Sequence, residues 1–138
     1  MGQHSIYLMF NGNCEEALNF YKDKLNGNIE FVQRYGEAPI DTPEEQKAKI
    51  MHASLDLQGF KIMASDSDGK RNVSFGDNFS IALNFKSDGD IERAFDALQT
   101  GGQVTMALQD TFWGAKFGMC TDKFGINWMF NYDKSPQK

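Results

Sequence analysis

Two pentapeptides, Ile6-Tyr7-Leu8-Met9-Phe10 and Ile81-Ala82-Leu83-Asn84-Phe85, decide the fold of this chain. They share Ile, Leu and Phe at alternating positions, at an offset of 75 residues (81 − 6). Alternation with a period of two indicates a β-strand that buries one of its faces. The recurrence of this pattern indicates that the chain consists of two similar halves.

Each pentapeptide leads through a polar break into a segment with helical periodicity. In the first half, Asn13 followed by Glu16 is typical of a helix start, because the Asn side chain can accept a hydrogen bond from a free backbone N–H. Both predicted helices end at glycine, Gly27 in the first half and Gly101 in the second. Apolar residues repeat at helical spacing in both segments: Ala17, Leu18, Tyr21 and Leu25, then Ile91, Ala94, Phe95 and Leu98.

A hairpin signal follows in each half, around Gly59 and Gly125, where glycine can supply a positive φ. The offset here is 66 residues (125 − 59), so the first half is longer by nine. The excess is predicted to lie in the polar stretch 36–49, where Thr42-Pro43-Glu44-Glu45 is typical of a capped helical turn.

The predicted fold is therefore α+β, with two paired βαβββ modules. Module one covers about residues 1–70 and module two about residues 76–133, within a single domain of 138 residues. We expect a mostly antiparallel, curved sheet around a groove, with the helices on the outer face.

Composition excludes several classes of protein. The net charge is −5, with 14 Lys and Arg against 19 Asp and Glu, and no basic stripe that could bind nucleic acid. No apolar run approaches the roughly 18 residues of a membrane helix, and no signal peptide is expected from the first residues. Cys14 and Cys120 suit a reducing compartment as buried thiols, so a cytoplasmic protein with no membrane or nucleic-acid partner is expected.

Strand alternation predicts which side chains line the groove. The apolar set, with Trp128 among it, should face the helices as core. The opposite face mixes Met, Tyr, Asn, Ser and His, a poor core but a suitable pocket lining. The predicted ligand-binding residues are Tyr7, Met9, His52, Met63, Ser65, Ser80, Asn84, Asn127 and Met129. A sheet face covered by a partner subunit is the alternative.

Several of these stretches carry a family resemblance: Tyr7 to Asn13, Met51-His52-Ala53, Ile62 to Asp66, Phe112-Trp113-Gly114, and Trp128-Met129. Together they span nearly the whole chain. The sequence resembles the PhnB-like branch of the vicinal oxygen chelate superfamily, which includes glyoxalase I, extradiol dioxygenases and bleomycin-resistance proteins. This branch is often labelled with a 3-demethylubiquinone 3-methyltransferase domain name. The resemblance also implies a homodimer, with the apolar residues near Phe112, Trp113 and Phe117 at the contact.

Metal-using members of this superfamily place His or Glu ligands on the first and last strands of each half. The repeat offsets carry those positions onto Ser5 with Ser80, and Met63 with Met129. Serine and thioether are poor ligands for Mg²⁺, Zn²⁺ or Fe²⁺. Hence no metal site and no cofactor are predicted.

Other motifs do not indicate chemistry of their own. His52, Ser54 and Asp56 lie on one predicted strand face, where their side chains run parallel and do not converge as a hydrolase triad does. The D-x-D-G string at 66–69 lacks the later acidic ligand of an EF-hand loop and is interpreted as a turn. The junction Phe10 to Cys14 is not the glycine-rich loop of a Rossmann-type methyl donor site, so methyl transfer is not expected.

Two functional hypotheses remain. The first is a metal-free protein that binds a small organic molecule in its groove, which is lined by Met, Tyr and Asn. The second is an enzyme of the vicinal oxygen chelate type, a lyase, isomerase or dioxygenase with non-standard ligands, or one that uses His52 and Tyr7 as acid/base partners. The identity of the ligand does not follow from the sequence.

Overall fold

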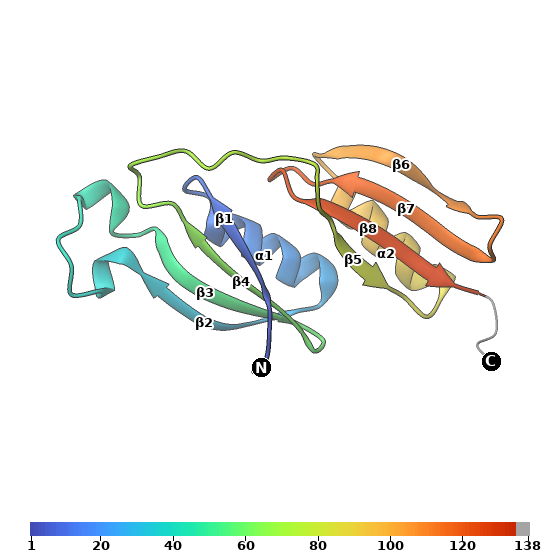
Figure 1. Cartoon of the computed structure of the whole chain (residues 1–138), viewed down its shortest axis with the longest axis horizontal. Coiled ribbons are helices and arrows are strands. Elements are labelled where there is room, and N and C mark those ends of the chain that lie inside the picture. Colours follow the sequence, from blue (N-terminus) through green and yellow to red (C-terminus); the bar gives the residue numbers. More distant parts are fainter. Residues whose placement is uncertain (135–138) are drawn as a thin grey trace. The chain divides into compact units, whose positions relative to one another are not determined.

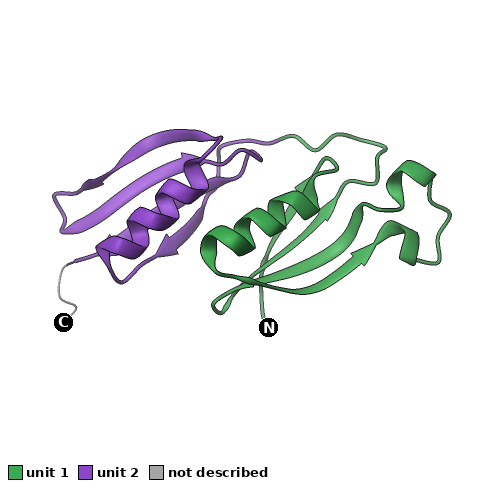
Figure 2. Ribbon diagram, turned by 180° about the vertical axis from the view of Figure 1, so that it is seen from behind, with its two compact units in different colours: residues 1–74 green, residues 75–138 purple. Residues whose placement is uncertain are grey.

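The computed structural model describes residues 1–134 and contains two compact units, residues 1–74 and residues 75–138 (Figures 1 and 2). Unit 1 contains β1 (Ile6–Phe10), α1 (Cys14–Leu25), β2 (Asn28–Arg34), β3 (Ile50–Leu57) and β4 (Phe60–Asp66). Unit 2 contains β5 (Ile81–Asn84), α2 (Asp88–Gln99), β6 (Gln103–Asp110), β7 (Ala115–Thr121) and β8 (Asn127–Asp133).

Both units have the same sheet topology. The strand order is β1-β4-β3-β2 in unit 1 and β5-β8-β7-β6 in unit 2. The first and last strands of each unit pair in parallel, and the remaining pairs are antiparallel. In each unit the helix packs on one face of its four-stranded sheet (Figure 2). The predicted α+β fold with two βαβββ modules is confirmed.

The core of each unit lies between the helix and the sheet, as strand alternation predicts. Leu8 and Phe10 of β1 are buried, whereas Tyr7 between them is 46% exposed. Trp128 of β8 is fully buried, which confirms it as a core residue. Phe60 has the same parity in β4 as the buried Ile62 and Ala64 but is 41% exposed, because it opens β4 directly after the hairpin turn.

The two hairpin glycines adopt the predicted positive φ, 99° at Gly59 and 92° at Gly125. The end of α1 differs from the prediction, because Asn26 takes the left-handed conformation. Gly27 is required for another reason: a Cβ there would lie 2.6 Å from a methyl group of Leu57. The glycine therefore permits close packing of the chain after α1 against β3.

The polar stretch between β2 and β3 contains the predicted helical turn, a 3₁₀ helix at Glu44–Gln46 directly after Pro43. A second 3₁₀ turn covers Tyr35–Glu37. The stretch is fixed at its base, because the Tyr35 N–H donates to the Lys49 carbonyl at 3.0 Å. The Tyr35 hydroxyl also donates to the backbone carbonyl of Asp66 at 2.8 Å.

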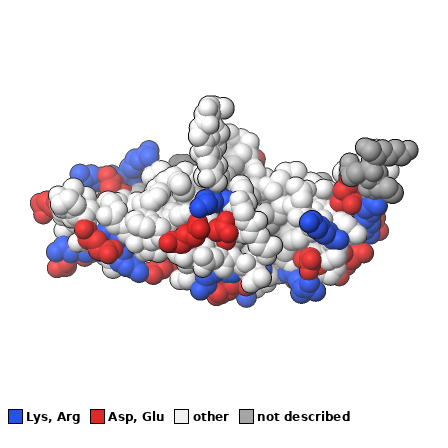
Figure 3. Space-filling view, turned by 90° about the horizontal axis from the view of Figure 1, so that it is seen from below, with Lys and Arg blue, Asp and Glu red and all other residues white. Residues whose placement is uncertain are grey.

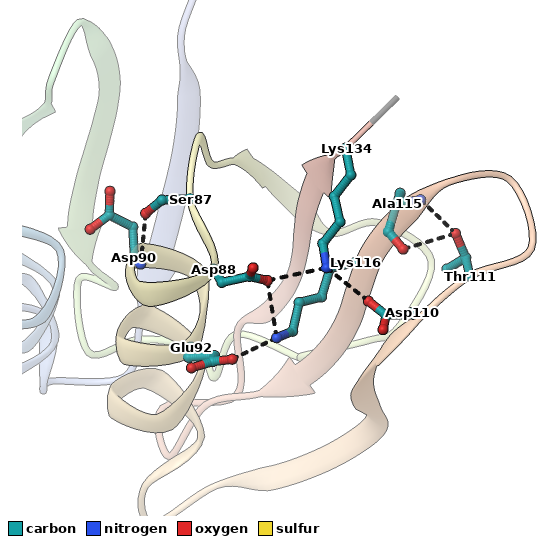
Figure 4. A network of polar contacts seen from close by, with 9 residues as sticks. All are labelled: Ser87, Asp88, Asp90, Glu92, Asp110, Thr111, Ala115, Lys116 and Lys134. Atoms are coloured by element: carbon teal, nitrogen blue, oxygen red, sulfur yellow. Dashed lines mark hydrogen bonds and ion pairs between the residues drawn. The ribbon is translucent and has the colours of Figure 1, made fainter. Parts of the chain in front are cut away.

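In unit 2, two lysines tie the sheet to the start of α2 (Figure 4). Lys116 of β7 pairs with Asp88 and Glu92, and Lys134 pairs with Asp88 and Asp110. The hydrogen bonds from Lys134 and then Lys116 lower the pKa of Asp88. Elsewhere the charges are mixed, and Figure 3 shows Lys and Arg interspersed with Asp and Glu on the face that it draws.

Both cysteines are free and buried, as expected for structural thiols. Burial raises the pKa of the Cys14 thiol, although Cys14 opens α1. Burial and the nearby Asp122 carboxylate raise the pKa of Cys120 to about 12. Both thiols therefore stay protonated at neutral pH and are poor nucleophiles.

No helix among residues 1–134 is long and apolar enough to cross a membrane.

The start of α1 is capped by a residue distant in sequence. Asn13 occupies the predicted N-cap position but makes no side-chain cap. Instead, Asp66 at the end of β4 is buried, and its Oδ1 accepts from the N–H groups of Gly12 and Cys14, each at 2.9 Å. Its Oδ2 accepts from the Ile50 N–H at 2.9 Å. One carboxylate thus joins α1, β3 and β4.

Replacing this carboxylate should destabilise the protein. We expect Asp66→Asn to lower the free energy of unfolding by about 2–3 kcal/mol, because an amide cannot accept at both positions and leaves a buried N–H unpaired. Urea denaturation followed by circular dichroism measures the change. The matched control is Asp68→Asn, since Asp68 lies in an exposed turn and, within residues 1–134, accepts a hydrogen bond from the Lys70 N–H alone. Equal stability of both variants would contradict this role for Asp66.

Candidate functional site

The sheet face of unit 1 that points away from α1 carries the predicted site residues of the first half. Strand register places Tyr7 beside Met63, Met63 beside Ser54, and Ser54 beside Phe31. The next row contains Met9 beside Ser65, and His52 beside Gln33. The structure therefore brings together five of the predicted residues on one face: Tyr7, Met9, His52, Met63 and Ser65.

An aromatic cluster dominates this face. The Tyr7 and His52 rings are stacked with centroids 5.7 Å apart, and the Phe31 ring lies 5.8 Å from that of His52. Phe31 is 49% exposed, close to the value for Tyr7. Large aromatic side chains usually bury most of their surface. Two half-exposed rings flanking a histidine therefore form a surface on which a flat ligand can stack.

Tyr7 and His52 also form a polar pair, with the Tyr7 hydroxyl 3.1 Å from Nδ1 of His52. In the tautomer that carries its proton on Nε2, His52 accepts from the hydroxyl and keeps Nε2–H as a donor. In the other tautomer Nδ1 donates to the hydroxyl oxygen, and Nε2 becomes an acceptor. The pair can thus present either a donor or an acceptor to a ligand beside the rings.

The serine and methionine side chains of this face differ in exposure. Ser54 and Ser65 are buried, while Met9 and Met63 are half-buried. A methionine side chain is flexible and polarisable and packs against varied ligand shapes. The face therefore combines rigid aromatic rings with adaptable thioethers above small serine side chains.

The corresponding face of unit 2 is rich in methionine. Register places Ala82 beside Met129, Met129 beside Met119, and Met119 beside Met106. Met106 is exposed and Met119 and Met129 are half-buried. In the next row, Asn131 Nδ2 donates to Asn84 Oδ1 at 3.2 Å. The predicted residues Asn84 and Met129 lie on this face.

The remaining two predicted residues lie at its edge. Ser80 precedes β5, and Asn127 opens β8. Asn127 Nδ2 donates to the carbonyls of Gly76 and Phe79, and its Oδ1 accepts from the Thr121 hydroxyl at 2.7 Å. These bonds hold the segment before β5 against β8, so the amide of Asn127 has a structural role in unit 2.

Sequence reasoning missed four residues of these faces: Phe31, Gln33, Met106 and Met119. The strands β2 and β6 contain register shifts, between Ile29 and Phe31 in one and around Met106 in the other. Such irregularities interrupt the alternation from which faces are assigned. The aromatic residue Phe31, between Glu30 and Val32 of β2, was one signal that could have drawn attention to this strand.

The residues present do not fit the metal site of the superfamily. Ser5 lies just before β1 and Ser80 just before β5, while Met63 and Met129 lie in β4 and β8. A set of two hydroxyls and two thioethers does not suit a hard or borderline divalent cation. Within residues 1–134, no cluster of three or more His, Cys, Asp or Glu side chains could hold a metal ion.

The other sequence motifs take structural roles. Asp56 Oδ1 accepts from the Gly59 N–H at 3.1 Å in the hairpin turn, while His52 pairs with Tyr7, so the hydrolase triad is absent. The D-x-D-G string does form a turn, with φ of 86° at Gly69, although Asp66 belongs to the core of unit 1.

Comparison with known proteins agrees with this geometry. The family model described as 3-demethylubiquinone-9 3-methyltransferase matches residues 3–130. Protein YjdN of Escherichia coli (strain K12) is 33% identical over 140 residues, which cover 94% of this chain and 95% of YjdN.

Solved structures show the same family. Protein PA1353 from Pseudomonas aeruginosa is 43% identical with a TM-score of 0.88, covering 98% of this chain and 100% of PA1353. A PhnB protein from Bacillus cereus is 27% identical with a TM-score of 0.82, covering 95% of this chain and 99% of that one. A glyoxylase/bleomycin resistance protein/dioxygenase domain from Frankia sp. EAN1pec, 15% identical with a TM-score of 0.72, shares the fold. The chain therefore belongs to the 3-demethylubiquinone-9 3-methyltransferase family, with a PhnB protein among its relatives, and it shares the fold of a glyoxylase/bleomycin resistance protein/dioxygenase domain.

Proposed function

We propose that this protein binds a small organic molecule without a resident metal or cofactor, and that the aromatic face of unit 1 is the principal contact. The single observation that carries the proposal is the cluster of Tyr7, His52 and Phe31, which leaves two aromatic rings half exposed beside a hydrogen-bonding histidine. Rings that can stack and a polar group that fixes orientation are the common components of small-molecule sites.

The chemistry of the face indicates the class of ligand. Stacking on Phe31 and Tyr7 favours a flat, largely apolar molecule, and the Tyr7–His52 pair favours one with a hydroxyl or carbonyl at its edge. The methionines of unit 2 offer a second, adaptable surface of the same apolar character. A protein that sequesters such a molecule needs no catalytic group.

Binding can be tested with 2-naphthol, which combines a flat aromatic ring with one hydroxyl. We expect ¹⁵N amide shifts to change along β1, β3 and β4, and Phe31→Ala to weaken binding about threefold to tenfold through the lost ring contact. Phe60→Ala is the matched control, because it removes another exposed phenylalanine of unit 1, 41% exposed against 49% for Phe31, that lies outside this face. Equal binding by both variants would refute the proposed surface.

Methyl transfer is not supported by the β1–α1 junction. The N–H groups of Gly12 and Cys14, which a Rossmann-type site would offer to a bound cofactor, are taken by the Asp66 carboxylate. The name of the family is therefore not sufficient evidence that this protein transfers methyl groups.

The second candidate is an enzyme of the vicinal oxygen chelate type, favoured only by the short Tyr7–His52 distance. Because the four carried-over positions are serine and methionine, we expect the purified, untagged protein to contain far less than one metal ion per chain. Mass spectrometry of metal content measures this, with divalent-ion thermal shifts alongside. Stoichiometric metal would favour the enzyme over the binding protein.

We also propose a cytoplasmic homodimer that has neither a membrane nor a nucleic-acid partner. The two free cysteines suit a reducing compartment. The turn between β6 and β7 presents Phe112, which is 97% exposed, and Trp113, which is 56% exposed, with ring centroids 5.0 Å apart. Exposed aromatic clusters of this kind are typical of interfaces.

Removing these two rings should dissociate the dimer. We expect Phe112→Ser with Trp113→Ser to raise the dimer dissociation constant at least about tenfold, because the interface loses its aromatic anchors. Sedimentation equilibrium measures the constant, and Phe79→Ser is a control that removes another exposed aromatic of unit 2. A wild-type protein that stays monomeric at high concentration would rule out the dimer.

A further inference from the structure

A hollow at the edge of unit 1 has a different character from the aromatic face. It lies where three segments meet: the β1–α1 junction, the end of the stretch between β2 and β3, and the chain after β4. Its volume is about 440 Å³, which is within the range of small-ligand sites. Every lining residue is a glycine or carries a polar side chain, with Gln46, Lys49, Ser67 and Asn72 among them.

Lys49 places a positive charge in this hollow. Its Nζ donates to the Gly12 carbonyl at 2.8 Å, which holds the half-buried side chain in position. No carboxylate within residues 1–134 comes close enough to form an ion pair with it. An ammonium group has three N–H bonds, so two remain for a bound group.

Gln46 adds a second group in need of a partner. Its Oε1 is buried, and in the part of the chain that the structure describes nothing donates to it. Buried acceptors are nearly always paired, with protein, water or ligand. Gly69 makes room for this amide, because a Cβ at Gly69 would clash with Gln46 Nε2.

The charge around the hollow also favours an anion. The two residues after Gly69, Lys70 and Arg71, are exposed and make no ion pair within the described residues. At the start of α1, the N–H groups of Gly12 and Cys14 already donate to Asp66. The positive charge within the lining of the hollow therefore comes from Lys49, while Lys70 and Arg71 adjoin the lining in sequence, two and three residues after Asp68.

We propose that this hollow binds a small hydrophilic anion, a phosphate or carboxylate that also carries a hydroxyl group. The anionic oxygens accept from Lys49 Nζ, and the hydroxyl donates to Gln46 Oε1. Ser67 and Asn72 supply further hydroxyl and amide groups around the bound molecule. This site is distinct from the aromatic face, and its ligand is polar where that of the aromatic face is flat and apolar.

Glycerol 3-phosphate is a suitable probe, with glycerate as the carboxylate equivalent. We expect ¹⁵N amide shifts at Gly12, Ser67 and Gly69 on titration with either anion, and none with glycerol. Lys49→Met should weaken binding at least about tenfold, whereas Lys49→Arg should retain it. Lys47→Met is the matched control, because it removes the same charge two residues away from an exposed side chain that pairs with Glu44.

A second variant separates the hydroxyl contact from the charge and does not depend on the folding of the Lys49 variants. Gln46→Leu should reduce the affinity for glycerol 3-phosphate to that for inorganic phosphate. Binding of glycerol as strong as that of the anions, equal affinities in Lys49→Met and Lys47→Met, or no amide shifts with either anion would overturn the proposal. Loss of 2-naphthol binding in Phe31→Ala leaves it unaffected, so the two sites are tested independently.

Discussion

The carboxylate of Asp66 is the interaction on which unit 1 depends. It accepts three backbone N–H groups, from Gly12, Cys14 and Ile50, and it is buried. A buried charge is tolerated only when hydrogen bonds replace its hydration, and three N–H donors meet that requirement. Because these donors belong to the start of α1 and the start of β3, the bonds fix both relative to β4. The aromatic face and the polar hollow are both built on elements held in this way.

Unit 2 fixes the start of its helix with different residues, although its sheet has the same topology. The repeat offset of 66 residues carries Asp66 onto Tyr132, so the buried carboxylate has no counterpart at that position. The Ser87 hydroxyl accepts from the Asp90 N–H at 3.1 Å, and the ion pairs of Lys116 and Lys134 hold the helix start. Asp122 is buried instead in the β7–β8 turn, where Oδ2 accepts from the indole N–H of Trp128 at 2.8 Å. The two units thus share one strand order but use different polar residues to fix the helix on the sheet.

The sequence predicted what depends on periodicity and missed what depends on distant polar partners. Alternation correctly assigned Leu8, Phe10 and Trp128 to the core, because burial of one strand face leaves a direct trace in the residue pattern. Asn13 was an incorrect side-chain cap, since local sequence cannot show that Asp66, over fifty residues later, binds the N–H groups of Gly12 and Cys14 on either side of it. Phe31 and Met106 escaped assignment because register shifts in β2 and β6 break the period. Irregular strands therefore contributed three of the four missed residues, Phe31, Gln33 and Met106, whereas Met119 lies in β7.

The two faces of each sheet are under different packing constraints, and this difference explains the composition of the aromatic face. The face toward the helix must be apolar and closely packed, and it supplies the core of its unit. The opposite face is free of that requirement, so it can keep half-exposed rings and a Tyr–His pair that add little to stability. The positions that the family resemblance assigns to metal ligands hold serine and methionine, which are poor ligands for hard divalent cations. The binding proposed for this face therefore depends on ring stacking and on the Tyr7–His52 hydrogen-bonding pair.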